Sequence, residues 1–252
     1  MVDFTGGTWR SLIDGSEVVA IPDEGLNHSY IIDDETATNV IDVQGDKNLD
    51  IIGADLVSDS DAFGGVALEL NRDDPGYAST DSPVSADIIG DDEDYSVCST
   101  IKVLDTSALT ADRNIWVANT PADYDGDALF GLSVTESFEI FGQHFSDGTR
   151  FNSVYEATQS ELDNNWLSVI WTCSNATDRN IYVELQEGSD NTGFDANGSA
   201  DSFWTFGGEP RSESDKTNDR ILPARLGRVD VYDRILDETE RQSWHNAQPH
   251  TS

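Results

Sequence analysis

Three stretches near the end of the chain decide the fold: residues 164–188 read NNWLSVIWTCSNATDRNIYVELQEG, residues 202–208 read SFWTFGG, and residues 224–247 read ARLGRVDVYDRILDETERQSWHNA. The first contains a Trp-led apolar strand, a polar turn and a second strand. The second is typical of a strand that ends in Gly-Gly. The third alternates apolar residues and then turns acidic, which indicates a strand followed by a short helix. Together they predict the closing strands of an antiparallel sheet.

The rest of the chain is also rich in strand signals. Short apolar runs such as HSYII, NVIDV, LDIIGADLV and GGVALEL are separated by Asp, Gly and Asn every 8–12 residues, as in a β-sandwich. Between residues 104 and 165, the runs RNIWVAN, ALFGLSV, FEIFGQHF and NSVYEAT predict four further strands, with a tight turn at Asp147-Gly148. Helix is expected only near the end, over Glu238 to His245, with Asp237 as its cap and Glu240 completing a capping box.

This order of elements resembles the laminin-G-like jelly rolls of the concanavalin A-like lectin/glucanase superfamily, which includes the pentraxins. Residues 64–77 are similar to the family's G-x-A-L-x-F-D-G-x-x-D-Y strand and turn, and residues 87–103 to its L-D-I-T-G-D-F-T-V-S-x-W-V-K strand. In the latter, Tyr95, Val97, Ser99, Ile101 and Val103 alternate inward. The resemblance implies an all-β fold, an antiparallel concanavalin A-like sandwich over residues 25–252. Residues 1–24 are expected to form an N-terminal arm or docking segment; the alternative is a first strand packed on the sandwich.

The charge is unusual. The chain has 49 Asp and Glu against 14 Lys and Arg, a formal net charge of −35. Either the protein works in molar salt, which screens self-repulsion, or it carries many calcium ions. The scarcity of lysine (Lys47, Lys102 and Lys216) and the dispersed acids favour the halophilic interpretation. Such a surface offers nucleic acids and anionic membranes no basic patch, so neither is an expected partner.

The sequence shows no long apolar segment and no export signal. No run of 18 apolar residues is present. The first residues, MVDFTGGTWRSLIDG, lack a basic region, an apolar region and a twin-Arg pair. The protein is therefore expected to remain where it is made, or to leave the cell inside an assembled virus particle.

The two cysteines, Cys98 and Cys173, leave two alternatives. The resemblance implies a disulfide, because pentraxins join two comparable strands with one. Strand alternation, however, puts Cys98 on the face opposite Val97, whereas Cys173 shares the face of Val169 and Trp171. We therefore favour two free, unreactive thiols.

Hydrolytic motifs are missing. Glucanases of this superfamily carry two carboxylates on alternate positions of one strand, about 5–5.5 Å apart. The nearest approach is Glu161-Leu162-Asp163, and no second Glu follows at the required spacing. No Gly-x-Ser-x-Gly elbow occurs, and His144 is interpreted as a structural or surface residue. The expectation is that the protein is not an enzyme.

Calcium is the one cofactor that the sequence suggests. Asp123, Asp125 and Asp127 alternate in a short acidic run, although Val134 stands where an EF-hand needs a bidentate Glu. The alternative is a solvated acidic turn. The pentraxin resemblance implies an acidic calcium loop after Gly207, where only Glu209 matches.

A glycan site is predicted in the long loop after the 164–188 stretch. Lectins of this kind use an aromatic platform with flanking Asp and Asn at loop tips. Phe194 lies in a polar loop that is long enough to reach a ligand; the alternative is a plug folded onto the core. The candidate ligand-binding residues are Asp190, Asn191, Phe194, Asp195 and Asn197. Trp166, Trp171 and Trp204 are assigned to the core.

These observations lead to one functional hypothesis and two alternatives. The hypothesis is a non-enzymatic structural protein on the virion surface of a virus of halophilic archaea, a turret, decoration or fibre that binds host surface glycans or glycoprotein. Its N-terminal arm would dock on other virion proteins, and it would form a homo-oligomer. The alternatives are a purely architectural assembly protein and a divergent glycoside hydrolase or lyase.

Overall fold

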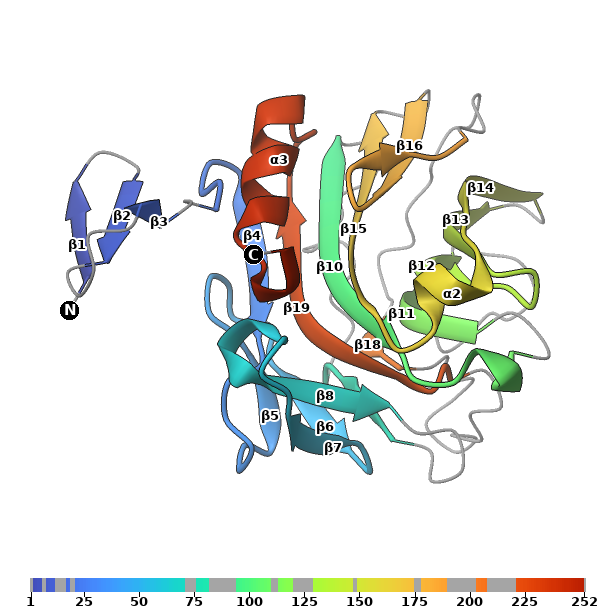
Figure 1. The fold of residues 1–252 in the computed structure, drawn as a ribbon, viewed down its shortest axis with the longest axis horizontal. Helices are drawn as coiled ribbons and strands as arrows, with labels where there is room; N and C mark the ends of the chain where they lie inside the picture. Colours follow the sequence, from blue (N-terminus) through green and yellow to red (C-terminus); the bar gives the residue numbers. More distant parts are fainter. Residues whose placement is uncertain are drawn as a thin grey trace.

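The computed structural model describes residues 2–5, 8–11, 17–18, 21–70, 76–81, 94–109, 113–119, 129–146, 149–174, 178–189, 203–207 and 221–251. Its named strands pair antiparallel and form a two-layer sandwich (Figure 1). The predicted class, an all-β antiparallel sandwich of the jelly-roll type, is confirmed.

The first layer is built around β19, a central strand from the end of the chain. The strand order is β17-β16-β15-β10-β19-β4. Two strands share the edge of β19 that faces away from β10. Strand β8 pairs with the first three residues of β19, and β4 pairs with residues 228–232 of β19. Strand β7 pairs with β8. The bounds are β4 Leu26–Ile31, β7 Asp55–Ser58, β8 Val66–Leu70, β10 Tyr95–Val103, β15 Trp166–Ser174, β16 Asp178–Val183, β17 Gln186–Glu187 and β19 Ala224–Tyr232.

The second layer runs β14-β13-β12-β11-β18-β9-β6-β5. Strand β5 pairs with both β4 and β6, so it joins the two layers on one side. On another side, Val154 of β14 forms a bridge with Ser189, just after β17. The four strands predicted between residues 104 and 165 are present as β11–β14. The bounds are β5 Asn39–Asp42, β6 Leu49–Ile52, β9 Tyr77–Ser79, β11 Arg113–Asn119, β12 Leu129–Val134, β13 Glu139–Ser146, β14 Thr149–Glu156 and β18 Phe203–Phe206.

The main core lies between the layers. Trp171 and Trp204 are fully buried in it, as the sequence predicts. Gly142 on β13 faces Trp171: a Cβ there would lie 2.5 Å from the indole ring, so only glycine lets the layers approach at this point. Trp166 is also buried in a hydrophobic cluster, as predicted. This cluster, which includes Ala62 and Ala67, lies on the outer face of β15 and not between the layers.

Helix α3, Glu238–Asn246, covers part of the outer face of the first layer (Figure 1). The predicted capping box at Asp237 and Glu240 is present. Fully buried Trp244 packs in a cluster with Cys98, Ile170 and Tyr232. Its indole Nε1 donates a 2.6 Å hydrogen bond to Asp230 on β19. The helix is therefore fixed to the sheet by both apolar packing and a buried polar contact.

Helix is not confined to the C-terminal segment. A one-turn helix, α2 (Gln159–Leu162), lies between β14 and β15. A second capping box, formed by Thr158 and Glu161, stabilises this turn. The described residues also include three short 3₁₀ turns, at Phe63–Gly65, Thr106–Ala108 and Pro249–Thr251. The expectation of helix only near the end was therefore wrong.

The two buried cysteines are not joined by a disulfide, which confirms the prediction from strand alternation. Cys173 belongs to the core between the layers, and Cys98 to the cluster beneath α3. The thickness of the sheet therefore separates the two thiols. Burial raises the pKa of the Cys98 thiol, which keeps it protonated and unreactive.

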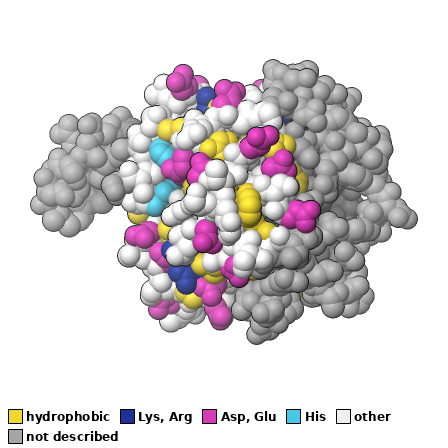
Figure 2. All heavy atoms as spheres, turned by 45° about the vertical axis from the view of Figure 1, so that its right-hand side comes forward, with side chains coloured by type: hydrophobic (Ala, Val, Ile, Leu, Met, Phe, Trp, Pro, Cys, Tyr) yellow, Lys and Arg dark blue, Asp and Glu magenta, His cyan; other side chains and the backbone are white. Residues whose placement is uncertain are grey.

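Three short strands near the start of the chain, β1 Val2–Thr5, β2 Thr8–Ser11 and β3 Glu17–Val18, form a sheet of their own. Figure 1 shows this sheet to one side of the sandwich. Figure 2 shows acidic side chains spread over the described part of one face. None of the described helices has both the length and the apolar character needed to cross a membrane.

Candidate functional site

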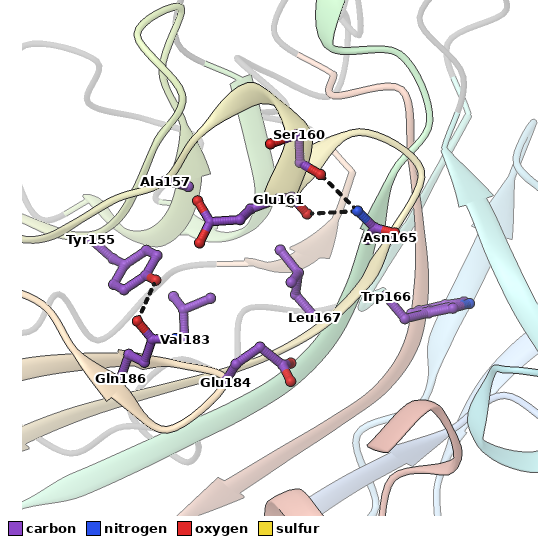
Figure 3. A pocket seen from close by; sticks show the side chains of 10 residues that line it. All are labelled: Tyr155, Ala157, Ser160, Glu161, Asn165, Trp166, Leu167, Val183, Glu184 and Gln186. Carbon is purple, nitrogen blue, oxygen red and sulfur yellow. Dashed lines mark hydrogen bonds between the residues drawn. The ribbon is translucent and has the colours of Figure 1, made fainter. Parts of the chain in front are cut away.

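The candidate site is a pocket of about 350 Å³ at one edge of the sandwich (Figure 3). It lies between the end of β14, the short helix α2, the start of β15 and the β16–β17 hairpin. Leu167 and Val183 supply apolar surface. The polar groups come from four different segments and are Tyr155, Ser160, Glu161, Asn165, Glu184 and Gln186.

Glu161 forms one wall and is held by the capping box of α2. Its Oε2 accepts hydrogen bonds from the backbone N and the hydroxyl of Thr158, both at 2.6 Å. These bonds lower the pKa of Glu161. Asn165 Nδ2 donates to the carbonyls of Ser160 and Glu161 at 2.9 and 3.2 Å. This wall therefore presents an ionised carboxylate on a short, well-capped turn.

Glu184 forms the opposite wall from the β16–β17 turn. Glu184 and Leu185 both have positive φ, 50° and 63°, a conformation that non-glycine residues rarely adopt. A reciprocal contact with Ser168 on β15 holds the turn: Glu184 N donates to Ser168 O at 3.0 Å, and Ser168 N donates to Glu184 Oε1 at 2.5 Å. The strained turn thus fixes a carboxylate at the pocket.

Two histidines support Glu184 from the C-terminal segment. His250 Nε2 lies 3.4 Å from Glu184 Oε1, and His245 Nε2 lies 4.0 Å from Oε2. Burial alone would raise the pKa of Glu184, but the hydrogen bonds from His250 and Ser168 outweigh it and lower this pKa. Burial lowers the pKa of His245. Glu184 is therefore ionised at neutral pH, and His245 is predominantly neutral.

Ser168 and His245 form a hydrogen bond whose role is structural. Ser168 Oγ lies 2.6 Å from His245 Nδ1, and Glu184 is on the other side of the same ring. These residue types also occur in hydrolytic triads. Ser168 is only 1% exposed, so a substrate carbonyl has no path to its hydroxyl. The contact fixes α3 to β15 behind the pocket.

Tyr155 lies at the end of the pocket beside Gln186 (Figure 3), and its hydroxyl donates to Gln186 Oε1 at 3.2 Å. Burial and the nearby charges of Glu161 and Glu184 raise the pKa of Tyr155. The hydroxyl therefore stays protonated and can both donate and accept. Hydroxyl, amide and carboxylate groups around apolar surface suit a small polyhydroxylated ligand.

The residues that the sequence singled out are not those of this pocket. The predicted ligand-binding residues Asp190, Asn191, Phe194, Asp195 and Asn197 lie outside the described residues, as do the predicted calcium ligands Asp123, Asp125, Asp127 and Glu209. In the Glu161-Leu162-Asp163 run, Leu162 is buried and Asp163 accepts from the Thr106 hydroxyl at 3.1 Å, so the two acids do not form a strand-borne pair.

Sequence reasoning missed Tyr155 and Glu184 and gave Glu161 no binding role. These residues come from β14, α2 and a turn after β16, and strand pairing alone brings them together. One signal was present in the sequence: Thr158 and Glu161 match the capping-box spacing and mark the α2 turn.

A second hollow, of about 300 Å³, lies beside the β5–β6 turn and is lined by Asn39, Asp46, Lys47, Asn48, Asp50, Thr80 and Asp81. Across the part of the chain that the structure describes, no three or more His, Cys, Asp or Glu side chains are grouped to hold a metal ion. This hollow therefore adds no metal site to those predicted.

The fold is similar to solved structures of sialidases and of toxin binding domains. Trypanosoma rangeli sialidase in complex with sialic acid matches with a TM-score of 0.66 and 18% identity, over 92% of this chain and 35% of that chain. The binding domain of Botulinum neurotoxin DC in complex with rat synaptotagmin II matches with a TM-score of 0.66 and 12% identity, over 89% and 52%. The binding domain of Paraclostridial Mosquitocidal Protein 1 matches with a TM-score of 0.64 and 17% identity, over 88% of this chain and 52% of that chain. No protein-family model and no curated protein matches the sequence.

These likenesses support the β-sandwich fold and correct one expectation. This chain spans only 35% of the sialidase and 52% of each toxin structure. The expectation that the protein is not an enzyme is wrong as stated, because sialidases, which are enzymes, are among the structures it matches. Binding domains match as well, and a fold by itself assigns no activity.

Proposed function

We propose that this chain is a carbohydrate-recognition domain whose ligand lies in the pocket between α2 and the β16–β17 hairpin. The observation that carries the proposal is the convergence of Tyr155, Glu161, Asn165, Glu184 and Gln186 around one apolar surface. The likeness to toxin binding domains and to a sialidase bound to sialic acid supports it.

The test is a glycan-binding screen in about 2–4 M salt, where self-repulsion is screened. Tyr155→Phe removes one hydroxyl and is expected to weaken binding about five- to tenfold, the effect of one lost hydrogen bond. Glu156→Gln is the control, because Glu156 is exposed next to Tyr155 on β14 but does not line the pocket. Equal affinity of the Tyr155 variant and the parent would refute the location of the site.

The loop prediction remains part of the proposal. Its support is the sequence order, because residues 190–197 follow within a few positions of Gln186, which lines the pocket. Phe194→Ala should weaken glycan binding if Phe194 contacts ligand and should leave it unchanged if the ring is a plug. Titration with Ca²⁺ of the parent and of Asp125→Asn tests the calcium prediction.

We further propose that the domain is laminin-G-like and lies on the virion surface of a virus of halophilic archaea, where it binds host surface glycans or glycoprotein. The net charge of −35 supports work in molar salt. The β1–β3 sheet, which pairs only within itself among the described strands, supports docking on other virion proteins and assembly as a homo-oligomer. Mass spectrometry of purified particles tests the location; absence from the particles would contradict it. Particle assembly without any glycan binding would favour the architectural alternative.

A further inference from the structure

We propose that the pocket selects carbohydrates that carry a protonated amine and rejects acidic sugars such as sialic acid. This inference rests on the proposed function and names its ligand class. It follows from the two carboxylates of Glu161 and Glu184, residues that line the pocket on opposite sides (Figure 3).

Both carboxylates are charged, and each has an oxygen that can accept a hydrogen bond from a ligand. Glu161 accepts its two bonds from Thr158 at Oε2, and no described residue donates a hydrogen bond to its Oε1. Glu184 accepts from Ser168 N at Oε1, while Oε2 has only His245 Nε2 at 4.0 Å among the described residues. A carboxylate can accept about four hydrogen bonds, so both walls retain capacity for a donor on the ligand.

No positive charge on the described lining balances these carboxylates. The described lining contains neither Lys, Arg nor His. Lys102, near the rim residue Trp166, is 3.5 Å from Asp59 and thus already paired. His245 and His250 contact Glu184 from the C-terminal segment and do not line the pocket. A ligand carboxylate would therefore meet two like charges, whereas an ammonium group would meet two opposite ones.

The experiment compares three sugars by calorimetry at the lowest salt concentration at which circular dichroism shows the folded protein. Glucosamine carries the amine, N-acetylglucosamine has the same ring without the charge, and sialic acid carries a carboxylate. We expect glucosamine to bind about tenfold more tightly than N-acetylglucosamine and sialic acid to bind weakest.

The variants Glu161→Gln and Glu184→Gln should each reduce the ratio of glucosamine affinity to N-acetylglucosamine affinity, with an unchanged circular dichroism spectrum. Glutamine also completes a capping box, so the first variant keeps the α2 turn. Glu156→Gln should keep the full preference. Equal binding of the two hexosamines, or tightest binding of sialic acid, would overturn the inference and leave the proposed function standing. Binding of no glycan in this comparison or in the wider screen would overturn both.

Discussion

At the scale of single residues, Asp42 shows how one carboxylate organises a turn. It is 4% exposed at the end of β5. Its Oδ1 accepts from the backbone N of Ser29 at 3.0 Å and of Gly45 at 2.9 Å, and its Oδ2 contacts His28 Nδ1 at 2.6 Å. Asp42 therefore fixes the β5–β6 turn to β4, at the point where the two layers join.

Asp42→Asn should lower the free energy of unfolding by about 2–3 kcal/mol, because an amide NH₂ would face donors that now meet a carboxylate oxygen. Denaturant unfolding in high salt measures the effect. Asp46→Asn is the matched control: Asp46 lies in the same turn with a side chain that is 84% exposed, and its replacement should change little. Equal effects at the two positions would refute the role given to Asp42.

The same carboxylate predicts how stability depends on acid. Burial alone would raise the pKa of Asp42, but the bonds from His28, Gly45 and Ser29 outweigh it and lower this pKa from 3.8 to about 2. A depressed pKa in the folded state stabilises the protein above the unfolded-state pKa. We therefore expect about 2 kcal/mol to be lost as the pH falls from about 4 to about 2. In Asp42→Asn this contribution should be missing, so the loss of stability over the same pH range should be smaller than in the parent.

At the scale of elements, the attachment of α3 depends on Trp244 and Asp230. Trp244→Phe keeps most of the packing and removes the bond from Nε1 to Asp230, so a loss of about 1–3 kcal/mol is expected. Trp244→Ala also opens a cavity and should lose about 3–5 kcal/mol. Denaturant unfolding of both variants checks the order. If Trp244→Phe matched the parent, the buried hydrogen bond would have no net stabilising role.

Elements with a local signal could be predicted from the sequence. Tyr95, Val97, Ile101 and Val103 alternate into the core as their spacing indicates, because a strand places every second side chain on the same face. Asp237 likewise marked the start of α3. Trp166 begins the same strand as Trp171 and lies on the opposite face, as alternation predicts, where it packs with Ala62 and Ala67 and stacks on His250. What alternation could not predict is which residues cover that face.

The candidate site could not be predicted because its parts are non-local. Tyr155 and Glu184 come together only through the bridge between Val154 and Ser189 and the pairing of β15 with β16. The positive φ angles of Glu184 and Leu185 also had no sequence signal, since neither residue is Gly or Asn. Composition predicted an acidic surface but could not place two carboxylates across one pocket.

At the scale of the whole molecule, a net charge of −35 opposes compaction unless salt screens it. We expect the midpoint of thermal unfolding to rise steadily with added KCl, and dialysis to about 0.1 M salt to unfold or dissociate the protein. Circular dichroism across that range measures the change. A spectrum that stays constant down to low salt would contradict halophilic adaptation.

The position of β19 has a consequence for synthesis. This strand lies at the centre of its layer, between β10 on one edge and β4 with β8 on the other, and the ribosome makes it after all three. A nascent chain that stops before residue 224 would leave three strand edges open and exposed to other chains. Closure of the sandwich must therefore await synthesis of residues 224–232, which makes the pairing of β19 a late step in the folding of this domain.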